Sequence, residues 1–220
     1  MYDLSAVFGI DELSSVPVGS SLLVTGKDGI DTEPYLLTVL ANGLQNGEGA
    51  ILVTGSAPQA VEALEKRTAI DSAAVCVIEY QSGSEREQYT LENGVFVYAV
   101  PSPNDLTGIG IGLAECFDQL RRAGIDQGRV GFLSLSTVLE ATSEKELFKF
   151  SHVVASRLAS AGFLGMFALD TIEGDESGKV LREAFDGTIE FRETGETAEG
   201  RVTGREWEAN HWQPLSPPAE

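Results

Sequence analysis

The chain alternates between short apolar runs and longer segments whose apolar residues recur every three or four positions. Apolar runs bounded by glycine or proline are typical of buried strands, and the longer segments are typical of amphipathic helices. The predicted strands cover residues 20–26, 49–54, 74–80, 94–100, 129–135 and 162–169. The predicted helices cover residues 32–45, 57–67, 104–122 and 143–161. This alternation predicts an α/β fold with a mainly parallel central sheet that is flanked by helices.

Residues with special backbone preferences mark the ends of these helices. Pro34 lies in the first turn of its helix, where the missing N–H costs nothing. Asn104 is the expected cap of the third helix, and Ser143 with Glu146 has the spacing of a capping box in the fourth. The helix between the first two strands is long enough for a crossover, which predicts that these strands form a parallel pair.

The last third of the chain changes character. Polar loops are expected over residues 81–93 and 170–178. Residues 187–192 and 201–207 alternate between apolar and polar side chains, which predicts C-terminal antiparallel strands that extend the sheet. Residues 1–212 are therefore expected to form a single domain, and residues 213–220 to form a disordered C-terminal tail.

The charge balance is the most unusual bulk property of the 220-residue chain. It has 34 acidic and 15 basic residues, for a formal net charge of −19, and the acids are dispersed along its whole length. A phosphate backbone binds clustered Lys and Arg, so we expect no direct nucleic-acid partner. Dispersed surface acid suits a halophilic protein in concentrated salt, where screening cancels self-repulsion. An ordinary acidic cytoplasmic protein is the alternative.

Two cysteines and the absence of long apolar runs bear on location. Cys76 and Cys116 lie in apolar segments, apart from any histidine or C-x-x-C pair, and are expected to be buried free thiols. No apolar run approaches the roughly 18 residues of a membrane helix, and no segment has the pattern of a targeting leader. We therefore expect a cytoplasmic protein without membrane contact.

The segment after the first strand lies where a phosphate-binding loop would be. Such loops have the pattern G-x-x-x-x-G-K-[ST], in which backbone N–H groups cradle phosphates, Lys contacts the terminal phosphates and the hydroxyl binds Mg²⁺. The corresponding residues here are Gly26, Lys27, Asp28, Gly29, Ile30, Asp31, Thr32 and Glu33. Together with residues 22–26 before it and 37–44 after it, this segment resembles the KaiC/RadA group of RecA-superfamily ATPases. The resemblance implies a RecA-like P-loop NTPase fold.

The three positions that hold ATP and magnesium in this group are changed. Asp31 stands at the second glycine, Thr32 at the lysine and Glu33 at the magnesium-binding hydroxyl. Two carboxylates would then face the phosphates, which like-charge repulsion makes unfavourable by several kcal/mol in order of magnitude.

Two further ATPase positions also differ from the group. After the second strand, where the group carries the acidic residue that activates water, residues 54–57 read Thr-Gly-Ser-Ala. In the Walker B strand Leu133 replaces the metal-binding aspartate, while Ser134 and the two residues after it keep the Ser-Leu-Ser pattern. The resemblance therefore implies a pseudo-ATPase with degenerate Walker A and Walker B motifs. We expect no catalytic residues, no bound cofactor and no metal site.

Three functions are compatible with this pattern. The first is a non-catalytic KaiC-like regulator or scaffold in signalling or transcriptional control, which binds a sensor, a regulator or an active family member and keeps the homo-oligomerising scaffold. The second is a weak ATPase in which Lys27 acts as the early lysine of deviant Walker loops. The third is an adaptor of a DNA-repair recombinase.

The remaining polar and aromatic candidates are expected to be structural. His152 lies on the fourth helix without a second ligand, and His211 lies between Trp207 and Trp212, which are expected to close one end of the core or an interface. The acidic residues 173–176 lie where recombinases of the group contact DNA, but their charge has the wrong sign. They lack the spacing of a calcium loop and are expected to be solvated.

Overall fold

The computed structural model of the protein describes residues 1–27, 30–80, 85–171, 177–195, 197–207 and 211–218. The strands are β1 (Ser21–Lys27), β2 (Gly49–Thr54), β3 (Val75–Tyr80), β4 (Glu87–Thr90), β5 (Phe96–Val100), β6 (Gly128–Phe132), β7 (Leu164–Thr171), β8 (Gly187–Thr194), β9 (Thr197–Gly204) and β10 (Gln213–Pro214). The helices are α1 (Ser5–Phe8), α2 (Glu33–Gln45), α3 (Ala57–Glu65), α4 (Leu106–Arg122), α5 (Leu135–Ala141), α6 (Glu144–Ala161) and α7 (Ser177–Arg182), with short 3-10 helices η1 (Asp11–Ser15) and η2 (Ser72–Ala74).

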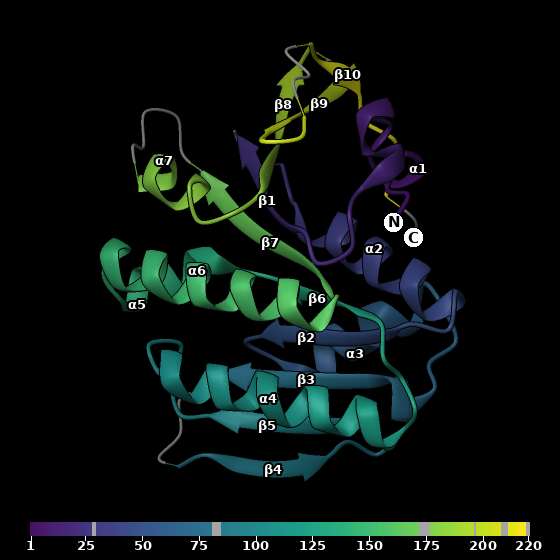
Figure 1. Cartoon of the computed structure of the whole chain (residues 1–220), viewed down its shortest axis with the longest axis vertical. Helices are drawn as coiled ribbons and strands as arrows, with labels where there is room; N and C mark the ends of the chain where they lie inside the picture. Colours follow the sequence, from purple (N-terminus) through teal and green to yellow (C-terminus); the bar gives the residue numbers. More distant parts are fainter. Residues whose placement is uncertain (28–29, 81–84, 172–176, 196, 208–210, 219–220) are drawn as a thin grey trace.

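These strands form one sheet in the order β10-β9-β8-β1-β7-β6-β2-β3-β5-β4. All pairs from β8 to β5 in this order are parallel, whereas β4, β9 and β10 pair antiparallel at the two edges. The structure confirms the predicted mixed sheet of mostly parallel strands with flanking helices (Figure 1).

Helices cover both faces of the sheet, which explains why its central strands are apolar throughout. Leu22 and Val24 of β1 belong to a buried cluster with α1, α2 and α3, whereas Leu23 belongs to a second cluster with α4, α5, α6 and α7. Consecutive side chains of a strand point to opposite faces, so each must be apolar when both faces are covered. Figure 1 shows α4 and α6 running side by side over one face.

The strand neighbours differ from the sequence prediction. β1 pairs with β7 and β8, and β2 pairs with β3 and β6, so the predicted direct pairing of β1 with β2 is wrong. Helix length shows that a crossover is parallel, but it does not show how many strands are inserted between the connected pair.

Three local elements also correct the prediction. β4 lies inside the predicted polar loop 81–93, where its mostly exposed side chains left no apolar pattern. The predicted strand 129–135 ends at Phe132, and α5 begins at Leu135. The cap of α4 is Asp105, whose carboxylate accepts the Gly108 N–H, and not Asn104. The capping box of Ser143 and Glu146 is confirmed.

The C-terminal hairpin is shifted from its predicted position. β9 spans residues 197–204 where 201–207 was predicted, because the turn is at Gly195, whose φ of 67° suits glycine. Residues 213–218, predicted to be part of a disordered tail, are held against the fold: Gln213–Pro214 pair with β9, and Leu215 packs against the core. Within the described residues, no helix is both long and apolar enough to cross a membrane.

Candidate functional site

The residues singled out in the sequence meet at the carboxyl edge of the parallel strands. Gly26 of β1 is paired with Asp170 of β7, and Val53 of β2 is paired with Phe132 at the end of β6. Ligands of open α/β sheets bind in the crevice outside this edge. Glu33 after β1 and Leu133 after β6 are thus brought to one end of the sheet.

A pocket of about 300 Å³ lies at this edge. It is lined by Glu33, Thr54, Ser56, Tyr80, Leu133 and Ser134, among others. Among the described residues that line it, the only charged side chain is the Glu33 carboxylate, and there is no lysine or arginine. The pocket therefore offers a polyphosphate no positive side chain and one negative charge.

Ile30, just before α2, lies back against the end of β1. The Ile30 N–H donates to the Lys27 carbonyl at 3.2 Å, and a Cβ at Gly26 would collide with the Ile30 carbonyl oxygen. Gly26 is thus required for this close backbone approach. Lys27 is exposed at the end of β1 and does not line the pocket, and Asp28 and Gly29 lie outside the described residues.

The N-terminus of α2 is occupied by a side chain of the loop itself. The Asp31 carboxylate accepts the Glu33 N–H at 3.0 Å, while Thr32 is buried with 1% exposure. Backbone N–H groups at a helix N-terminus are the donors that phosphate-binding loops offer to an anion. Here Asp31 takes up one of these donors.

Glu33 lies in an environment that disfavours its charge. Burial raises the pKa of its carboxyl group, the neighbouring charges of Asp31 and Asp170 raise it further, and Arg67 lowers it in part. Asp31 and Glu33 therefore give this end of the sheet a negative potential.

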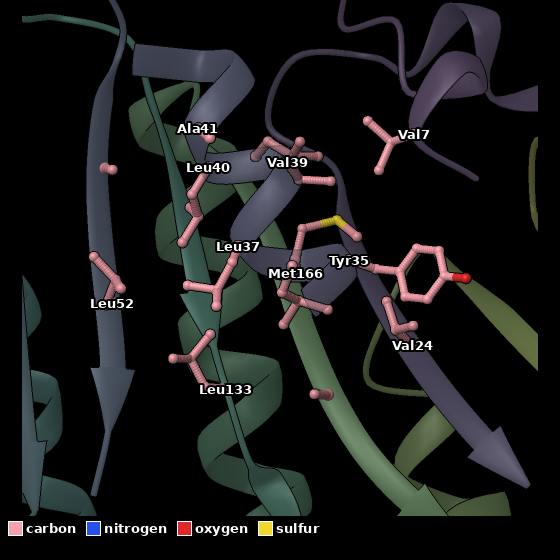
Figure 2. Close-up of a cluster of buried hydrophobic side chains, with 14 of the residues drawn as sticks. Val7, Val24, Tyr35, Leu37, Val39, Leu40, Ala41, Leu52, Leu133 and Met166 are labelled. Atoms are coloured by element: carbon pink, nitrogen blue, oxygen red, sulfur yellow. The ribbon is translucent and has the colours of Figure 1, made fainter. Parts of the chain in front are cut away.

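Leu133 lies in the hydrophobic core. It is 5% exposed and belongs to the same buried cluster as Leu37 and Leu40 of α2 (Figure 2). Its backbone N–H donates to the Val53 carbonyl at 3.0 Å, which fixes it beside β2. A carboxylate at this position would lie between this apolar cluster and the pocket, which is costly without a metal or cation.

The serines after Leu133 have structural partners. Ser134 Oγ accepts the Thr137 N–H at 3.2 Å and so caps α5. Ser136 Oγ accepts the Asp170 N–H at 2.9 Å and donates to its carboxylate at 3.3 Å, which joins α5 to β7. This cap was missed because residues 129–135 were predicted to be a strand. Ser134 followed by Leu135 and Val138 nevertheless has the pattern of a helix start.

Glu79 at the end of β3 is a polar residue of this edge that the sequence reading missed. It is 2% exposed, and its carboxylate accepts the Ala57 N–H at 2.8 Å and the Tyr89 hydroxyl. It therefore occupies the N-terminus of α3 as Asp31 occupies that of α2. The sequence signal that could have identified Glu79 is that it is a single acidic residue inside the apolar run 74–80.

The other sequence candidates lie away from this edge. His152 is exposed on α6 beside Phe148, and His211 Nε2 lies 3.4 Å from the Glu12 carboxylate. Trp207 is buried, and Trp212 lies against the guanidinium groups of Arg192 and Arg201.

The two cysteines lie close together in the core. Cys76 and Cys116 are buried free thiols as predicted, and the structure brings them together, with Cys76 Sγ 3.9 Å from the Cys116 carbonyl oxygen. Within the described part of the chain, no three His, Cys, Asp or Glu side chains form a group that could hold a metal ion. Residues 173–176 lie outside the described part.

Comparison with known proteins gives a family without an assigned activity. No curated protein matches the chain. A family model described as a family of unknown function (DUF7504) matches residues 19–191, which include the loop after β1 and the end of β6. Since this match covers more than half of the 220 residues, the protein belongs to the DUF7504 family.

Proposed function

We propose that the protein is a non-catalytic, RecA-like relative of the KaiC/RadA group that acts by binding a protein partner in signalling or transcriptional control. The observation that carries this proposal is the carboxyl-edge pocket, in which Glu33 is the only charged side chain among the described lining residues. A regulatory domain can keep the fold of an ATPase without its chemistry, because function resides in sites and not in the fold.

The loss of nucleotide binding is supported by three separate contacts. The Asp31 carboxylate takes up the Glu33 N–H, the Ile30 carbonyl lies against Gly26, and Leu133 packs in the core. Each contact uses a group or a space that ATP or magnesium would need. A single reverted residue would therefore not restore the site.

The RecA-like fold is supported by the relative position of two features. The loop after β1 and the Walker B-like position after β6 lie at the same edge, separated by β7. This is the edge at which the resemblance to the KaiC/RadA group places both motifs.

Phosphate release from ATP tests the absence of catalysis. In about 2 M KCl, where a chain of this charge is well screened, we expect release no faster than in buffer alone. ATP turnover by the wild type would contradict the proposal. If Lys27→Ala abolished that turnover and the exposed control Lys66→Ala left it unchanged, the result would support the unconventional ATPase.

A further inference from the structure

A groove of about 470 Å³ lies between α4 and α6, on the outer surface of the helical layer. Its rims come from two stripes: Gly110, Ile111 and Ala114 on α4, and Lys149, Val153 and Arg157 on α6. Residues three and four apart share one face of a helix, so each stripe is continuous along its helix. The groove is well separated in sequence from the degenerate nucleotide loop.

Apolar side chains are exposed on both rims. Among the described residues, the exposed large apolar side chains are Met1, Val18, Ile111, Val153 and Val180. Ile111 is 40% exposed and Val153 is 51% exposed, and both line this groove. Paired apolar exposure within a concave surface is typical of a helix-binding groove.

The charge of the groove is opposite to that of the chain. Among the described residues that line it, Lys149 and Arg157 are the charged ones, and none is acidic. In a chain with 34 acidic and 15 basic residues, this local excess of positive charge favours a carboxylate-bearing partner. Arg157 Nη1 also donates to the Gly110 carbonyl at 3.0 Å, which holds one cation at the rim.

Gly110 keeps the groove open. A Cβ at this position would lie 3.7 Å from Arg157 Nη1, which is an ordinary contact distance, so the helix itself tolerates a side chain there. By contrast, a Cβ at Gly112 would come 2.8 Å from the Tyr98 ring and 3.2 Å from Ile78, because that glycine faces the sheet. The packing of α4 therefore does not require glycine at position 110, and a larger side chain there would take up space in the groove.

We propose that this groove binds an amphipathic helix of a partner protein that presents apolar side chains flanked by carboxylates. The inference rests on the proposed partner-binding function and names the surface and the chemistry of the partner. A symmetric dimer through the same face would bring together two grooves whose charged residues, among those described, are basic, and like charges oppose it.

Two synthetic peptides test the proposal directly. Both are helical with leucine at i, i+3, i+4 and i+7; one carries glutamate at the flanking positions, and its twin carries lysine there. Binding is measured by fluorescence anisotropy in about 0.5 M KCl, where contact charges still discriminate. We expect the glutamate peptide to saturate the protein and to bind at least about tenfold tighter than the lysine twin.

Matched variants locate the binding surface. Val153→Asp and Gly110→Leu are expected to weaken the glutamate peptide about tenfold or more, whereas the exposed control Val180→Asp leaves it unchanged. Lys149→Glu is expected to remove the preference for glutamate, whereas Lys66→Glu, with the same change in net charge, preserves it. Circular dichroism melts confirm that each variant is folded.

Three results would overturn the inference. These are no saturable binding of the glutamate peptide, equal binding of both peptides, or groove variants that bind as the wild type does. A dimer in sedimentation equilibrium that Val153→Asp dissociates would assign the groove to a second copy and would also overturn it. Nucleotide binding is measured separately, so failure of the groove and failure of the pseudo-ATPase proposal are distinguishable.

Discussion

Single carboxylates set the electrostatics of the candidate site at the carboxyl edge of the sheet. Asp31 and Glu79 each accept an N–H at the start of a helix. Glu33 lines the pocket, and the charge of Arg67 offsets only part of the rise in its pKa. Glu33 and Leu133 were singled out in the sequence, and the structure places both beside one pocket, whereas their departure from the ATPase motifs stays a prediction. The role of Glu79 could not be predicted, because its partners Ala57 and Tyr89 come from other elements.

Glu33→Gln is expected to stabilise the fold at neutral pH. Burial and the charges of Asp31 and Asp170 raise the pKa of Glu33, so the folded state holds this proton more tightly than the unfolded state. Stability then falls as pH rises from the unfolded pKa, near 4.3, through the raised folded value. A glutamine at this position does not ionise, so we expect Glu33→Gln to raise the free energy of unfolding by roughly 0.5 kcal/mol at pH 7.

Urea unfolding at two pH values measures this effect. The gain should vanish below about pH 4, where both states are protonated. The exposed control Glu140→Gln should show no such gain. A Glu33→Gln protein that is less stable than the wild type at pH 7 would contradict the assignment.

At the scale of elements, a buried carboxylate joins the last helix to the sheet. Glu190 of β8 is 4% exposed in its side chain and forms ion pairs with Arg182 at the end of α7, at 2.7 Å, and with Arg201 of β9, at 2.6 Å. Burial alone would raise the pKa of Glu190, but the two guanidinium groups outweigh it, so this pKa is lowered. Such a lowered pKa contributes stability above the unfolded pKa that is lost as pH falls through the folded value.

Glu190→Gln is expected to cost about 3 kcal/mol at pH 7, because it leaves two partly buried cations without their counter-ion. The difference in the free energy of unfolding between Glu190→Gln and the wild type should shrink as the pH falls below about 4.5, because Glu190 then becomes protonated. Chemical unfolding monitored by circular dichroism measures both. Glu199→Gln, which breaks the more exposed pair with Arg192, should cost less than about 1 kcal/mol, and equal costs for the two variants would contradict this account.

The elements themselves were largely predictable where apolar periodicity was strong. The central strands and α2, α3, α4 and α6 follow from their patterns, and so does the capping box of α6. β4 was missed because an exposed edge strand has no apolar face, and α5 was missed because its first residues continue an apolar strand. The order of strands depends on contacts between distant segments, which local patterns do not encode.

At the scale of the whole molecule, the charge of −19 acts on stability through self-repulsion. Salt shortens the range of this repulsion to about 3 Å at 1 M, so we expect the melting temperature to rise by several degrees between about 0.1 and 1 M KCl and then to level off. Differential scanning calorimetry measures this rise. A melting temperature that is constant or falls over this range would contradict the expected adaptation to salt.

We propose that this molecule keeps the sheet edge of an ATPase-like fold but does not bind nucleotide there. Isothermal titration with ATP and magnesium in about 2 M KCl tests it most directly, with ADP and magnesium-free titrations as controls. We expect heats no larger than those of dilution at nucleotide concentrations up to about 1 mM, and saturable binding tighter than about 10 μM would overturn the proposal.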